Sequence, residues 1–102
     1  MVELTKKELF NAKNAGVKIE NGISFNIAKV GSFPDVDKNG NDVNVSCLMT
    51  TDGTIYTTIS ATIYNSLELL KEVIEETGSV TVQVNENTSN AGRSFFQLQI
   101  ID

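Results

Sequence analysis

The sequence contains no histidine, and this absence excludes a large part of enzyme chemistry. Of the 102 residues, none is histidine or tryptophan, and only one is cysteine. Ser-His-Asp and Cys-His nucleophile systems need an imidazole base, and so does the usual proton shuttle near neutral pH. No spacing of carboxylates indicates an enclosed acid-base pair. We therefore expect a protein that is not an enzyme and that needs no metal or other cofactor.

The chain also lacks the long hydrophobic run that a membrane segment or a signal peptide requires. A spanning helix needs about 18 or more mostly apolar residues, and no stretch approaches that length. The single Cys47 cannot form an internal disulfide and alternates with polar neighbours, which is typical of a small core residue. These absences predict a cytoplasmic protein without membrane contact. The length predicts one domain, residues 1–102.

Five segments alternate apolar and polar residues, and one helical segment separates the third from the fourth. Strands are expected near residues 17–31, 43–50, 54–60, 79–84 and 94–101. Asn21-Gly22 is expected to interrupt the first as a bulge or tight turn. Residues 62–77 carry apolar side chains at helical spacing and end at Gly78. This order is typical of the OB-fold, a five-stranded, partly open Greek-key barrel. The predicted fold class is mainly β with helices.

The alternation also assigns side chains to the two faces of the second and third strands. Val43, Val45, Cys47 and Met49 are expected to be buried, and Asn44, Ser46 and Leu48 to be exposed. In the third strand, Tyr56 shares a mostly polar face with Thr58 and Ser60. An aromatic ring on such a face can stack a nucleic-acid base. The alternative is that Tyr56 reflects only the strand propensity of tyrosine.

A short helix, within about residues 5–15, is predicted before a barrel that spans about residues 17–102. Thr5 and Glu8 have the spacing of a capping box, and Leu4 and Leu9 that of a hydrophobic staple. Gly16 is expected to end the helix. Two roles stay open for this segment. It can be a lid over one open end of the barrel, or a basic arm, because four of the eight basic residues precede position 20.

Two polar segments are expected to be loops that contact a ligand. Residues 31–42 hold the only proline and many Asp, Asn and Gly residues, and residues 85–93 join the last two strands. The corresponding loops of OB-folds commonly bind single strands or sugars. Residues 35–40 also match the first half of an EF-hand calcium loop. The match fails where Ser46 replaces the glutamate ligand, so a plain turn is the favoured interpretation.

Aromatic and basic side chains in and near these segments are the candidate nucleic-acid contacts. Arg93 and Phe95 combine a guanidinium that can meet a phosphate with a ring that can stack a base. The alternative for Phe95 is packing under the N-terminal helix. The net charge of −5 allows such a site, because the glutamate-rich helix face can lie far from it. The predicted contacts are Tyr56, Phe95, Arg93, Lys29, Phe33 and Lys38.

The chain resembles the small OB-fold single-stranded-DNA-binding proteins of tailed phages. The resemblance rests on the element order, on the hairpin of residues 51–56 that leads into the helix, and on the start of the last strand, residues 92–96. It implies sequence-independent binding of single-stranded DNA in phage DNA replication, with replication proteins as further partners. The acidic composition leaves open an alternative, a protein-interaction module of the same fold. Exposed rings on a basic concave face would favour DNA, and buried rings beside an acidic or apolar patch would favour a protein partner.

Overall fold

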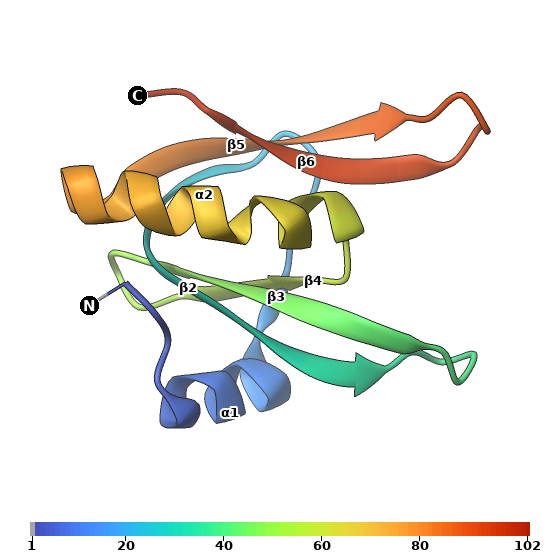
Figure 1. The fold of residues 1–102 in the computed structure, drawn as a ribbon, viewed down its shortest axis with the longest axis horizontal. Coiled ribbons are helices and arrows are strands. Elements are labelled where there is room, and N and C mark those ends of the chain that lie inside the picture. The colour runs from blue at the N-terminus through green and yellow to red at the C-terminus, as the bar shows by residue number, and fades with distance from the viewer. Residues whose placement is uncertain (1) are drawn as a thin grey trace.

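Six strands, rather than the five expected, form one sheet in this computed structural model, which describes residues 2–102. The elements are α1 (Lys6–Ala15), β1 (Val17–Lys18), β2 (Ser24–Val36), β3 (Asp42–Thr50), β4 (Ile55–Thr58), α2 (Ala61–Thr77), β5 (Val80–Thr88) and β6 (Ser94–Ile100). The strand order is β1-β4-β3-β2-β5-β6, with β1 parallel to β4 and all other neighbours antiparallel. The sheet curls into a half-barrel around α2 (Figure 1). The prediction of a mainly β fold with helices is confirmed.

The sixth strand appears because the first predicted strand is divided into β1 and β2. A turn at Asn21-Gly22 separates the two, as the sequence predicted, and Gly22 has a φ of 86°, which glycine adopts without strain. Within β2, the register shifts between Ile27 and Lys29. This bulge changes the alternation, so that Ile27 and Val30 both enter the same core cluster although they are three residues apart.

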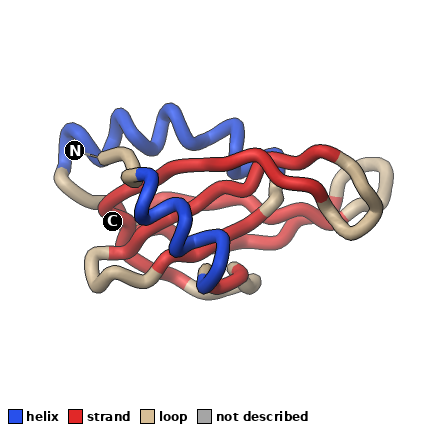
Figure 2. Tube along the Cα trace, turned by 90° about the horizontal axis from the view of Figure 1, so that it is seen from below, coloured by secondary structure: helices blue, strands red, loops and turns tan. Residues whose placement is uncertain are grey.

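The two predicted ligand loops are largely strands, which corrects the sequence-based assignment. β2 continues to Val36 and β5 to Thr88, so the loops shrink to turns at residues 37–41 and 89–93. Pro34 is tolerated in β2 because no strand within residues 2–102 pairs with it on the side away from β3. On that side β5 pairs only with residues 24–27, and the bridge from Glu3 reaches Val30. The β2–β3 and β5–β6 hairpins consequently project past the first turn of α2 (Figure 1). Both turns lie at the end of the molecule opposite the chain termini (Figure 2).

α2 supplies one side of the main core. Its buried residues are Ile63, Leu67, Leu70 and Ile74, which fall at the helical spacing read from the sequence. The last three pack with buried side chains of β2, β3 and β5. Ser60 caps the first turn, and Gly78 ends the helix with a φ of 86°. Within residues 2–102, no helix has the length and apolar character needed to cross a membrane.

α1 covers the opposite face of β2 and β3. The predicted capping box of Thr5 and Glu8 is present, and Leu4 and Leu9 join Val45 and Cys47 in a second core cluster. A helix therefore covers each face of this part of the sheet. The expectation that Ser46 and Leu48 are exposed is wrong, since both have zero relative exposure. Alternation separates two faces but does not tell whether a helix covers one of them or both.

Candidate nucleic-acid interface

A groove of about 710 Å³ lies between the two hairpins, and we call it the hairpin groove. β2 and β3 line one side of it, and the start of β6 lines the other. The connection from β4 to α2 and the first turn of α2 lie between them, and α1 and β1 contribute their adjoining ends. The lining residues from α1 to β3 are Ala12, Lys13, Gly16, Lys18, Ile19, Phe33, Asp35 and Val45. Those from β4 to β6 are Thr57, Thr58, Ile59, Ser60, Ala61, Thr62, Ser94, Phe95 and Phe96.

Gly16 allows the end of α1 to lie directly against β4. A Cβ atom at this position would stand 2.5 Å from the carbonyl oxygen of Ala12 and 2.5 Å from Cγ2 of Thr57. Only glycine fits into this space. β1 follows immediately and pairs in parallel with β4, with Lys18 opposite Thr57. The close approach thus brings the cations of Lys13 and Lys18 to the hairpin groove.

Ser60 joins the other side of the groove to α2. Its hydroxyl accepts the amide of Ile63 at 3.4 Å as the helix cap and donates to the carbonyl oxygen of Phe96 at 2.7 Å. β6 is an edge strand, so this bond supports it on the side where no strand pairs with it. The neighbours Phe95 and Phe96 point to opposite sides of β6. Phe96 packs against the core cluster of Ile19, Ile63 and Val84.

The hairpin groove combines apolar side chains with an excess of positive charge. Ile59 is 59% exposed, and the rings of Phe33 and Phe95 are half-buried. The charged lining residues are Lys13, Lys18 and Asp35, so cations outnumber anions in a chain whose net charge is −5. The acidic side chains of α2 do not line the groove. Such a surface suits a ligand with flat apolar faces and negative charges.

Four of the six predicted contacts lie in the groove or on its hairpins. Phe33 and Phe95 line it from opposite sides, although 62 positions separate them in the sequence. Arg93 is exposed in the β5–β6 turn, immediately before the lining residue Ser94, and Lys38 is exposed in the β2–β3 turn. The structure therefore places both aromatic residues in the lining of one groove and one cation in the turn of each hairpin.

Asp37 shapes the β2–β3 turn. Its carboxylate accepts the amides of Asn39 and Asn41, both at 2.9 Å. These hydrogen bonds, the one from Asn41 first, hold the pKa of Asp37 below its usual value. This is the behaviour of a plain turn. Among residues 2–102, no three or more Cys, Asp or Glu side chains are grouped as a metal site.

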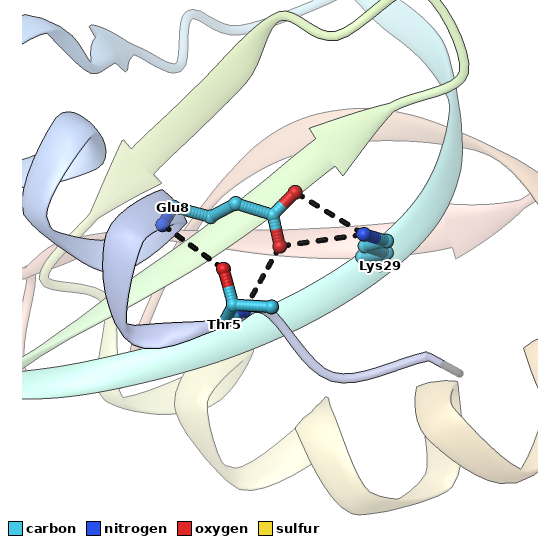
Figure 3. A network of polar contacts seen from close by, with 3 residues as sticks. All are labelled: Thr5, Glu8 and Lys29. Carbon is cyan, nitrogen blue, oxygen red and sulfur yellow. Dashed lines mark hydrogen bonds and ion pairs between the residues drawn. The ribbon is translucent and has the colours of Figure 1, made fainter.

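Lys29 does not line the groove. Its ammonium lies 3.1 and 3.3 Å from the two carboxylate oxygens of Glu8, and Glu8 also accepts the amide of Thr5 at 2.9 Å (Figure 3). The Thr5 amide is the main cause that holds the pKa of Glu8 below its usual value, and Lys29 adds to it against the opposing effect of burial. This network connects the first turn of α1 to β2.

Tyr56 does not line the groove either. Its ring is stacked on Phe25, with centroids 4.4 Å apart and planes inclined by 12°, and both rings pack against the core. The expectation that this face of the third predicted strand points away from the core is wrong. Ile55, on the other face of β4, packs against the cluster under α1. Both faces of this strand are therefore covered.

The sequence reasoning missed Gly16, Lys13, Lys18 and Ile59 as parts of one site. The lysines were noted only as members of a basic segment, and Gly16 only as a helix end. No local pattern marks Ile59, because its neighbours in the groove come from other strands. A glycine followed directly by a short strand was the one signal that could have suggested a close approach.

Residues 4–101 match the model of the family described as phage single-stranded DNA-binding protein. No curated protein and no solved structure shows a significant match to the chain. The family match confirms the resemblance stated from the sequence. Because it spans nearly the whole chain, the chain belongs to the phage single-stranded DNA-binding protein family.

Proposed function

We propose that this member of the phage single-stranded DNA-binding protein family binds single-stranded DNA in the hairpin groove, without sequence preference, during phage DNA replication. One observation carries the proposal. Phe33 and Phe95, from different hairpins, line one groove with two lysines and a single acidic residue, in a chain that is acidic as a whole. We also propose that the half-barrel is an OB-type domain whose first strand is split into β1 and β2.

Stacking gives the expected preference for single strands. Every base has a flat π surface, and a base in a duplex has both surfaces occupied by its neighbours. Contact with Phe33, Phe95 and Ile59 does not read the edges of a base, so it discriminates little between sequences. Each stacked base contributes about 1–3 kcal/mol. Two rings therefore supply a substantial part of a micromolar affinity, which corresponds to about 8 kcal/mol.

Few cations are available for phosphates, which limits the salt dependence. Lys13 and Lys18 line the groove, and Lys38 and Arg93 stand in the turns of the hairpins. Each phosphate contact with a single strand contributes about 0.7 to the slope of log K against log salt. Four contacts give a slope of about −3. Binding should therefore persist at salt concentrations that release strongly basic proteins from DNA.

Fluorescence anisotropy with labelled oligo-dT, a mixed-sequence oligonucleotide and a matched duplex tests the function. We expect similar affinity for the two single strands and much weaker binding of the duplex. Equal affinity for the duplex would show that electrostatics dominates and would contradict stacking. No binding to either single strand at low salt and micromolar protein would reject the proposed function and favour a protein partner.

Phe33→Leu and Phe95→Leu test the site itself. Leucine keeps an apolar side chain in the groove but removes the flat ring, so the fold should tolerate it better than alanine. We expect each variant to weaken binding to oligo-dT roughly fivefold or more. Phe33 also packs against the cluster under α1, so Phe33→Leu should lower the midpoint of urea unfolding slightly, whereas Phe95→Leu should leave it unchanged. Unchanged affinity in both variants would place the bases elsewhere on the protein.

A further inference from the structure

α1 exposes an aromatic ring that the core does not use. Phe10 is 68% exposed, whereas its neighbours Leu9 and Ala12 face the sheet and pack in the cluster under α1. A single exposed apolar side chain is common and needs no explanation. Phe10 differs from a single exposed apolar side chain because exposed lysines surround its ring.

Three cations surround Phe10 on the helix surface. Lys6 and Lys7 precede it by four and three residues, and Lys13 follows it by three, which are the spacings of neighbours on one helix face. All three lysines are exposed. Among the ion pairs found in residues 2–102, none involves them.

The only acidic residue of α1 is turned away from this face. Glu8 is bonded to Thr5 and Lys29 on the side of α1 that meets β2 (Figure 3). The solvent face of α1 therefore presents positive charge and a free ring without a competing carboxylate of its own helix. In a chain with thirteen acidic and eight basic residues, such a face is unusual.

The same face is continuous with the hairpin groove. Lys13 lines the groove and is also the neighbour of Phe10, one turn along α1. Lys6 lies seven residues before Lys13, which is about 10 Å along the helix axis. A strand that leaves the groove at Lys13 therefore meets Phe10 next and then the two lysines of the first turn.

We propose that the outer face of α1 is a second contact surface for the same strand of nucleic acid. Phe10 stacks a base, and Lys6 and Lys7 meet the phosphates that flank it. The proposal rests on the proposed function, because it extends the path of a strand that occupies the groove. A basic helix with an exposed ring also fits an anionic membrane surface, which the test below distinguishes.

The test measures the affinity of the full-length protein for oligo-dT of increasing length. Binding of the wild-type protein should strengthen with length until both surfaces are filled. Phe10→Ala should leave the affinity for the shortest bound oligonucleotide unchanged and weaken binding of the long ones roughly tenfold. Lys6→Gln combined with Lys7→Gln should do the same and lower the salt slope for long oligonucleotides only, by about 1.4 for two phosphates.

Leu69→Ala is the matched control, because Leu69 is 65% exposed on α2 and does not line the groove. It should change binding at no length. Equal affinities of Phe10→Ala and wild type at every length would overturn the proposal, and so would an equal loss for short and long oligonucleotides. If Phe10→Ala bound anionic phosphatidylserine vesicles less than wild type does and bound DNA equally well, the face would be assigned to a membrane instead. A wild-type protein that binds no oligonucleotide would reject the proposed function itself.

Discussion

The rings of Phe25 and Tyr56 are stacked with 4.4 Å between their centroids, although their strands are not neighbours in the sheet. Phe25 is on β2 and Tyr56 is on β4, and β3 lies between them. Strands two positions apart in a flat sheet are separated by almost 10 Å. The contact therefore depends on the curl of the half-barrel, which inclines side chains of its concave face toward one another.

Tyr56→Ala should destabilise the protein by about 2 to 3 kcal/mol, because it removes the stacked ring and its core contacts. Tyr56→Phe, which keeps the ring, is the control and should cost much less. The midpoint of urea unfolding measures both. An unchanged midpoint with a loss of oligo-dT binding would instead support the contact with DNA that the sequence predicted for Tyr56.

Phe95→Ala and Phe96→Ala should have opposite main effects, although the two residues are adjacent. Phe96 packs against a buried cluster, so its truncation should cost about 3 kcal/mol of stability. Phe95 should affect binding to oligo-dT more than stability, with a loss of about 1 to 3 kcal/mol in binding free energy. Measuring both quantities in both variants checks the assignment. The reverse pattern would show that Phe95 is the structural ring.

Arg93→Ala should weaken binding to oligo-dT and reduce the magnitude of the salt slope by about 0.7, the contribution of one phosphate. Lys71→Ala is the matched control, because it removes the same charge from a side chain that pairs with Glu3 and Glu68 and does not line the groove. Titrations at several salt concentrations provide the slope. Identical slopes for the two variants would show that Arg93 meets no phosphate.

Gly16→Ala should displace the end of α1, since the new Cβ would collide with Ala12 and with Cγ2 of Thr57. Overpacking of this kind typically costs about 1 to 3 kcal/mol. The backbone of Gly16 has a φ of −66°, so the effect is steric and not conformational. Thr57→Ser removes Cγ2 and should partly restore stability in the double variant. If the changes in unfolding free energy of Gly16→Ala and Thr57→Ser simply add in the double variant, the two positions do not touch.

Glu8→Gln should reduce the loss of stability in acid. The pKa of Glu8 is lower in the folded protein, chiefly through the Thr5 amide, so the charged carboxylate stabilises the fold. This contribution is present above the ordinary value of 4.5 and is lost as the pH falls through the lower folded pKa. Unfolding midpoints between pH 7 and pH 3 should therefore fall less in Glu8→Gln than in wild type. Glu72→Gln, which removes an exposed carboxylate from α2, is the matched control.

Local patterns were sufficient to predict both helices and most strands. The capping box at Thr5 and Glu8, the apolar spacing of residues 62–77 and the turn at Asn21-Gly22 are all present. Each depends on interactions within a few residues, which the sequence displays directly. The resemblance to phage single-stranded DNA-binding proteins was also read from the sequence and is confirmed by the family match.

The composition of the two polar segments predicted loops, but strand pairing extends into both of them. Residues 31–36 pair with residues 42–47, and residues 85–88 pair with residues 94–97. Strands pair through backbone hydrogen bonds, and polar side chains can lie on the exposed face of a paired strand. Asn, Glu and Pro can therefore occupy strands that a composition rule assigns to a loop. The local sequence shows which residues favour a turn, but it does not show how far the strands on either side remain paired.

The sequence by itself determined both helices, the general order of strands and helices, and the resemblance to the family. Caps, turns and alternation are short-range properties, so the local sequence displays them directly. Only the tertiary structure decided which faces are buried and which side chains share a site. Leu48 is buried because α2 packs on its face of β3, and Tyr56 meets Phe25 because the sheet curls. Phe33 and Phe95 share a groove because two hairpins distant in sequence project toward the same end of the molecule, on either side of the first turn of α2. These relationships depend on contacts between distant segments, which no local pattern encodes.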